Sequence, residues 1–456
     1  MKRISFFYIF SVLGIIGLLF ASVSYAADEK DLLALSIAAA QEAQEEVDVG
    51  QKITLDEEFA PEDFGLTGVG ILPTSPFYFL KGIRRTVQSA FTFDSAAEVE
   101  LKIRFSAEKL LETKEVAGAE GADPGDIKYA LENFQGELQR VTDRTKDAAD
   151  GLEEGKAIEL SKKLMDFTVK CQKSLGKIEK ALPPDLFEDI KLAKEKTSET
   201  FGGAFDLVKP EKVTEELVGV LETQKGSEFK DFKNIEVLKE IEEKVPEQAK
   251  DAIRLAQEQA LVRFQGELEK LQFAKRAVFE DFVREIGGSE ARQLEIITDL
   301  EAQPVSAEVR EVLAGAKEEA LSKTDKRLQT FAPDQQAKFL EHLAKGEIKN
   351  IRVLKELEHN VSKGVLAGIT QAKERAKGGI VEKIKLGEFK EEEKQELLGQ
   401  LEQFHDAKSL AVLDEIEELI PPEKKQFFSE LKQKAVVEIK RDIDRAGTAS
   451  QRQVIL

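Results

Sequence analysis

The sequence is poor in the residues that most catalytic and metal-binding sites use. It has one cysteine, three histidines, two methionines, four tyrosines and no tryptophan among its 456 residues. A single cysteine excludes an intramolecular disulfide bond and a cysteine-based zinc site. This residue, Cys171, shares helical spacing with Leu164, Phe167, Leu175 and Ile178, so we expect a buried and unreactive thiol.

Two of the three histidines lie in Glu-x-x-His runs, "ELEH" at 356–359 and "EQFH" at 402–405. This spacing occurs in carboxylate-bridged di-iron bundles, where one helix offers both ligands. On a helix, however, Glu356 and His359 lie far around the axis from Leu354, which belongs to the apolar face. We therefore expect the first pair to face water and the second to flank a helix end, with no metal bound.

Other motifs that carry chemistry are missing from the sequence. It has no Gly-rich phosphate loop, no HExxH, no acidic calcium loop and no GxSxG elbow. The run "EIEE", Glu240 to Glu243, could act as a pair of acids, but its position in a repeated polar helix face predicts solvated side chains. The sequence thus predicts no enzyme, no catalytic residue and no cofactor.

Acidic residues outnumber basic ones, 87 to 67, and the formal net charge is −20. Such a surface repels a nucleic-acid backbone, so we expect no nucleic-acid partner. The charged residues alternate with Leu, Ile, Ala and Phe at helical intervals. This pattern is typical of solvated helix faces rather than of disordered tails.

Residues 1–26 have the form of a secretory leader. Two basic residues precede an apolar run from Ile4 to Val23, and small residues follow in "SYA". We expect cleavage after Ala26 and an extracytoplasmic protein, whether secreted, periplasmic or at the cell surface. The apolar run is also long enough to cross a bilayer, so an uncleaved membrane anchor stays open as the alternative.

After the leader, residues 27–70 are expected to form a short helix and a tether, because helix formers give way to Gly, Pro, Asp and Glu. From Pro76 onward apolar residues recur every three or four positions, which indicates α-helices, and no strand is needed. The sequence therefore predicts an all-α fold. A helical hairpin over 71–120 is followed by an extended array of three-helix repeats over 121–456.

The array is inferred from a repeated stretch. The segment "NIEVLKEIEEKVPEQAKDAIRLAQEQAL" has counterparts about 60 residues apart, and the copies start at Cys171, Asn234, Gln293, Asn350 and Ser409. Each unit should have a middle helix with the "VLxExE" pattern, a long helix and a shorter third helix, which should begin at Pro210, at Pro333 or after the turn at Gly387. The long helices carry paired alanines four residues apart, Ala256 with Ala260, Ala316 with Ala320 and Ala372 with Ala376. Each pair shares a face on which a neighbouring helix can pack closely.

The stretch "ILPTSPFYFLKGIRR", residues 71–85, combines two prolines, three aromatic residues and three basic residues. We expect Ser75 to cap a helix that starts at Pro76. A second helix should begin with a capping box of Ser95 and Glu98.

The first of these two helices is expected to bury an apolar stripe. Its members are Phe77, Leu80, Ile83 or Arg84, Val87 and Phe91. The other side would face outward. If the helix instead contacts a membrane or a partner, the candidate residues are Phe77, Tyr78, Lys81, Arg84 and Arg85.

Residues 72–112 resemble an exported bacterial family, domain of unknown function 5667. The pattern of that family is approximately LPxSPxYxLK, an aromatic FT(F/P)D turn and a helix rich in Ala, Glu and Leu. The matching positions are Leu72, Pro73, Ser75, Pro76, Tyr78, Leu80, Lys81, Phe91, Thr92 and Asp94. Gly82 departs from the basic residue expected after Lys81. The resemblance implies a helical exported protein and brings no known activity.

Our main hypothesis is a non-enzymatic exported helical scaffold or interaction protein of the cell envelope, with another envelope protein as its partner. A second hypothesis is peripheral binding to a membrane surface through the amphipathic helix at 76–92. A third is extracytoplasmic signalling that depends on a partner. The enzymatic alternative would use buried carboxylates between units. The oligomeric state does not follow from the sequence.

Overall fold

The computed structural model describes residues 55–271, 276–303, 305–344, 348–385 and 407–445, all within one compact unit, Ile53–Leu456. These residues form α-helices and short 3₁₀ helices and no strand, which confirms the all-α fold class. Within the same ranges, no helix has both the length and the hydropathy that a membrane span requires. The predicted leader and the helix after it lie outside the described residues.

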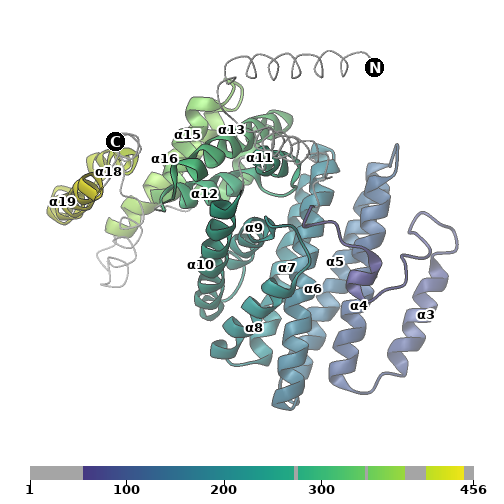
Figure 1. Cartoon of the computed structure of the whole chain (residues 1–456). Coiled ribbons are helices and arrows are strands. Elements are labelled where there is room, and N and C mark those ends of the chain that lie inside the picture. Colours follow the sequence, from purple (N-terminus) through teal and green to yellow (C-terminus); the bar gives the residue numbers. More distant parts are fainter. Residues whose placement is uncertain (1–54, 272–275, 304, 345–347, 386–406, 446–456) are drawn as a thin grey trace, which may run out of the picture. The chain divides into compact units, whose positions relative to one another are not determined.

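Four long helices form a bundle near the start of the described chain (Figure 1). They are α4 (Ser95–Gly118), α5 (Pro124–Ala149), α6 (Glu154–Ala181) and α7 (Phe187–Leu207), with the short η2 (Pro184–Leu186) between the last two. Helix α4 packs on α5 and α6, and α7 packs on the same two helices. Their apolar faces meet in a shared core that includes Leu110, Phe134 and Cys171.

Cys171 is fully buried, as predicted, and burial raises the pKa of its thiol well above the ordinary value. The predicted capping box at Ser95 was wrong. Asp94 caps α4 instead: its Oδ1 accepts a hydrogen bond from the backbone N–H of Ala97 at 3.0 Å, and this bond lowers the pKa of the Asp94 carboxyl. An acid one residue earlier fulfils the role expected of the serine.

Helix α3 (Phe79–Ala90) lies beside α4, with which it forms the predicted hairpin (Figure 1). The helix starts three residues after the predicted Pro76. Residues 73–78 form turns instead, in which the backbone N–H of Phe77 donates to the Oγ of Ser75 at 3.3 Å. Ser75 thus caps a turn rather than the helix.

Residues 55–66, which we call the strap, contradict the predicted tether. Leu55, Phe59 and Leu66 are buried, and the strap includes the short η1 (Pro61–Phe64). Two of its five acidic residues bind distant loops. Asp56 accepts from the backbone N–H of Ser227 at 2.7 Å, and Glu57 accepts from that of Gly287 at 2.8 Å. The segment packs because buried apolar side chains and long-range hydrogen bonds outweigh its turn-forming composition.

The remaining helices follow in series. They are α8 (Pro210–Thr223), α9 (Lys230–Glu242), α10 (Glu247–Lys270), α11 (Arg276–Glu285), α12 (Glu290–Glu301), α13 (Ala307–Thr330), α14 (Pro333–Phe339), η4 (Glu341–Ala344), α15 (Ile348–Asn360), α16 (Leu366–Lys385), α18 (Ala407–Leu419) and α19 (Pro422–Arg445). Helices α8 and α14 begin at the prolines from which the sequence predicted them to start.

The sequence copies correspond to pairs of helices. Four copies coincide with α9–α10, α12–α13, α15–α16 and α18–α19, and the copy from Cys171 spans the end of α6 and α7. All six paired alanines are buried, and close packing of neighbouring helices at these positions stays a prediction. The extended array of separate units and the domain boundaries at residues 70 and 120 stay predictions.

Candidate functional site

Helix α3 turns its basic side chains toward α4. Lys81 is buried, and its Nζ lies 2.9 Å from Glu108 and 2.7 Å from Glu112. Arg85 pairs with Glu108 at 2.6 Å. The hydroxyl of Tyr78 donates to the carboxylate of Glu112. These charged hydrogen bonds, rather than apolar contacts, hold α3 against the bundle.

A third cation joins this cluster from α4 itself. Lys109 lies 3.2 Å from Glu112 and 4.2 Å from the centroid of the Tyr78 ring. Burial lowers the pKa of Lys109, although Glu112 opposes the shift. Burial alone would raise the pKa of Glu108, but Arg85 and Lys81 hold it below the ordinary value. The cluster thus contains three cations and two carboxylates, and the formal net charge of these five side chains is positive.

The opposite side of α3 is apolar and exposed. Phe79 is 61% exposed and Ile83 is 57% exposed, while Phe93, just after the helix, is 90% exposed. The outward face, as we call it, consists of Phe77, Phe79, Leu80, Ile83, Val87, Phe91 and Phe93, each of them exposed. Single exposed apolar residues are common on protein surfaces, whereas a group of this size on one helix is typical of an interaction site.

The predicted buried stripe of this helix was therefore wrong. The sequence placed Phe77, Leu80, Val87 and Phe91 in the core, whereas Lys81 is the residue of α3 that is buried. The reason is the spacing on α4: Glu108 and Glu112 lie one turn apart, as Lys81 and Arg85 do on α3. The two pairs match, so the polar side of α3 faces inward.

The structure divides the five predicted contact residues between the two sides. Phe77 and Arg84 are exposed, and Arg84 makes no ion pair within the part of the chain that is described. Tyr78, Lys81 and Arg85 face α4 and bind its carboxylates. Sequence reasoning missed Glu108 and Glu112, although their matched four-residue spacing was a signal for them.

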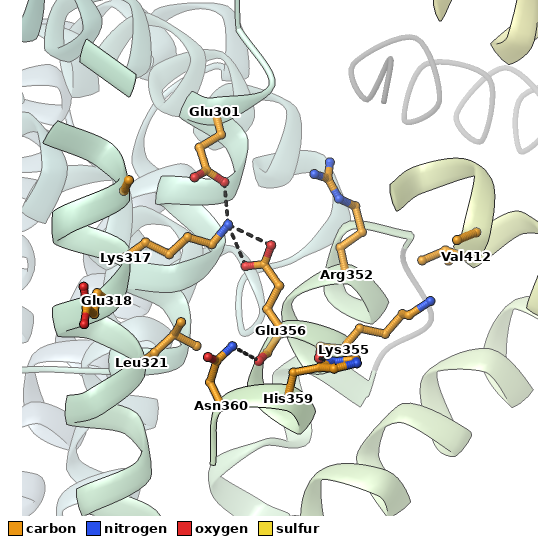
Figure 2. Close-up of a pocket in the computed structure, with 12 residues that line it drawn as sticks. Glu301, Lys317, Glu318, Leu321, Arg352, Lys355, Glu356, His359, Asn360 and Val412 are labelled. Carbon is orange, nitrogen blue, oxygen red and sulfur yellow. Dashed lines mark hydrogen bonds and ion pairs between the residues drawn. The ribbon is translucent and has the colours of Figure 1, made fainter. Parts of the chain in front are cut away.

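A second region of interest is a cavity of about 650 Å³ that side chains of α12, α13, α15 and α18 line. Figure 2 shows Lys317 between two carboxylates in this cavity. Its Nζ lies 2.6 Å from Glu301 and 2.7 Å from Glu356. The lysine thus joins the middle helix of its own copy to that of the next copy.

The same arrangement occurs in a smaller cavity of about 150 Å³. There Lys194 lies 2.7 Å from Glu179 and 3.3 Å from Glu240. Burial raises the pKa of Glu240, although Lys194 opposes the shift. For Glu179, Lys194 and Arg327 outweigh burial and lower the pKa.

The prediction that the run "EIEE" has solvated side chains was wrong. Glu240 and Glu243 are both half-buried. Glu240 pairs with Lys194, and Glu243 accepts a hydrogen bond from Arg292.

In each of the five sequence copies, a glutamate is bonded to a lysine or glutamine side chain, and the two residues lie at equivalent positions of the copy. The pairs are Glu179 with Lys194, Glu242 with Gln257, Glu301 with Lys317, Glu358 with Lys373 and Glu417 with Lys432. In every pair a carboxylate near the end of the first helix binds a side chain on the long helix that follows. The sequence repeat therefore has a repeated contact as its physical counterpart.

The structure describes the first of the two Glu-x-x-His runs, 356–359, but not the second. Glu356 is half-buried and bound to Lys317, whereas His359 is exposed and its Nδ1 lies 2.7 Å from the backbone oxygen of Lys355. Among the described residues, no three His, Cys, Asp or Glu side chains are placed to hold a metal ion. The second run, 402–405, lies outside the described residues.

The fold and the surface together define an all-α protein whose N-terminal bundle has an exposed apolar helix at its edge. Residues 70–185, which run from just before α3 to η2, match the family model described as Domain of unknown function (DUF5667). This match confirms the resemblance seen in residues 72–112 and extends it through α6. No curated protein and no solved structure matches the chain.

Proposed function

We propose that this protein is a non-enzymatic, exported helical scaffold of the cell envelope, held in place through the outward face of α3. The observation that carries the proposal is the orientation of α3. Its basic residues are used to hold it on α4, and its large apolar side chains are left exposed. A soluble protein rarely exposes such a group unless something binds it.

The non-enzymatic part of the proposal rests on how the reactive groups are held. Cys171 is buried with a raised pKa, so little thiolate is available as a nucleophile. In the two cavities, Glu179 and Glu240 are bound to Lys194, and Glu301 and Glu356 are bound to Lys317. The cavity around Lys194, at about 150 Å³, is also smaller than the roughly 300 Å³ at which ligand pockets usually begin.

Fractionation of bacteria that express the chain tests this function. The wild-type protein should be recovered with the envelope, and its mature N-terminus should be Ala27. The variant Phe79→Ser/Ile83→Ser/Val87→Ser should move to the soluble extract, because it removes apolar area from the outward face. Its unfolding midpoint should stay close to that of the wild type, since the replaced side chains are exposed.

A matched control is Leu255→Ser/Val262→Ser on α10, where both side chains are also exposed. This variant should stay with the envelope, because it leaves α3 intact. Recovery of the α3 variant in the envelope at the wild-type level would contradict the proposal. It would mean that another part of the chain, such as an uncleaved leader, holds the protein there.

A further inference from the structure

We infer that the outward face of α3 binds the surface of a membrane that contains anionic lipid. This inference rests on the proposed function, because it names what the outward face meets. It depends on three features of the described residues: the shape of the apolar face, its independence from the core and the charge around it.

The apolar face suits a helix that lies flat in a lipid surface. Phe79, Leu80, Ile83 and Val87 lie along one side of a helix of 12 residues, which is about 18 Å long. Aromatic side chains extend the same exposed surface at both ends, through Phe77 and Phe93. An interfacial helix buries a face of this kind at the boundary between headgroups and acyl chains.

Among the described residues, no core cluster includes these side chains. Within α3, Lys81 is the buried residue, and its partners are carboxylates and backbone oxygens, including that of Ile71 at 3.1 Å. The face is therefore free to enter lipid without opening the core. A hairpin joined by buried ion pairs also holds the helix in one orientation, with its apolar side outward.

The charge around the face complements an anionic surface. The chain has a net charge of −20, yet residues 64–93 contain no Asp or Glu. Arg84 is exposed at the edge of the apolar face, and half-buried Lys102 of α4 donates to the Oγ of Ser89 at 2.9 Å. Neither makes an ion pair within the described ranges. Anionic headgroups would attract these cations, and the acid that directly follows the stretch, Asp94, is paired with Lys156 at 3.1 Å.

Vesicle flotation tests the inference. The chain that begins at Ala27 is suitable, because residues 1–52 fall outside the unit Ile53–Leu456. It should float with vesicles of equal parts phosphatidylcholine and phosphatidylglycerol, and much less with phosphatidylcholine alone. Arg84→Gln should weaken binding about fivefold, and Phe79→Ser/Ile83→Ser/Val87→Ser should weaken it more than tenfold. Leu255→Ser/Val262→Ser should bind as the wild type does.

The other possible occupants give different results. If the wild type does not float but the α3 variant still leaves the envelope in cells, the lipid inference is overturned and the proposed function stands. If light scattering shows a wild-type dimer that the α3 variant loses, a second copy of the chain covers the face, which also overturns it. If the α3 variant floats and fractionates as the wild type does, both proposals fall.

Discussion

Asp56 and Lys173 are opposite charges that the fold buries together. Burial raises the pKa of Asp56 to about 6, although Lys173 and Ser227 oppose the shift. Burial likewise lowers the pKa of Lys173 to about 8, against the influence of Asp56. Lys173 also donates to the Oε1 of Gln224 at 2.8 Å. The strap thus places an acid in a site where its charged form is unfavourable.

This site gives a prediction for the dependence of stability on pH. The pKa of Asp56 is raised in the folded state, so its contribution to stability is full below the ordinary value of 3.8 and is lost as the pH rises through about 6. The wild-type free energy of unfolding, relative to that of Asp56→Asn, should therefore fall by about 2 kcal/mol between pH 4.5 and 7.5. Urea unfolding across this pH range measures the difference. Parallel curves for the two proteins would show that Asp56 titrates normally.

The sequence pattern could predict the burial of some residues but not the long-range contacts of others. Cys171 was predicted to be buried because it lies at helical spacing from apolar residues. Local periodicity is sufficient to predict the burial of such a residue. Asp56 and Glu57 bind Ser227 and Gly287, which are far away in the sequence. No local pattern reports such contacts, so the strap was mistaken for a tether.

At the scale of single elements, α3 shows what an amphipathic pattern leaves open. The spacing of Phe79, Ile83 and Val87 identifies an apolar side, but it does not say whether protein or solvent meets that side. The outcome was decided by Glu108 and Glu112 on another helix. The starts of α8 and α14 were easier to predict, because Pro210 and Pro333 act locally at the first turn.

The helix pairs of the sequence copies give a second prediction. Lys317 joins carboxylates of two copies, Glu301 and Glu356, whereas Lys432 joins Asp414 and Glu417 of one copy. Lys317→Met would leave two half-buried carboxylates without the lysine between them. It should lower the free energy of unfolding by about 2 to 3 kcal/mol.

Lys432→Met is the matched comparison, since Lys432 is more exposed than Lys317. It should cost less than about 1 kcal/mol, as exposed ion pairs usually do. Urea unfolding followed by circular dichroism would measure both variants. Equal losses would show that the bridge between copies adds nothing beyond an ordinary surface ion pair.

At the scale of the whole described unit, the strap joins the bundle to later helices. Lys114 of α4 donates to the backbone oxygen of Phe59, and Lys170 of α6 donates to that of Asp63. The acids of the same segment bind loops before α9 and α12. The region that matches the family model is therefore tied to the helices that follow it, through residues on its N-terminal side.

The central claim is that the outward face of α3 is open in the free protein, ready to bind. The chain contains no tryptophan, so Phe79→Trp places the only tryptophan of the variant on that face, where it can be excited apart from the four tyrosines. In the absence of vesicles, its emission should be that of a tryptophan in water, and iodide should quench it readily. A blue-shifted emission that iodide does not quench would show that the protein itself covers the face, and would contradict the account.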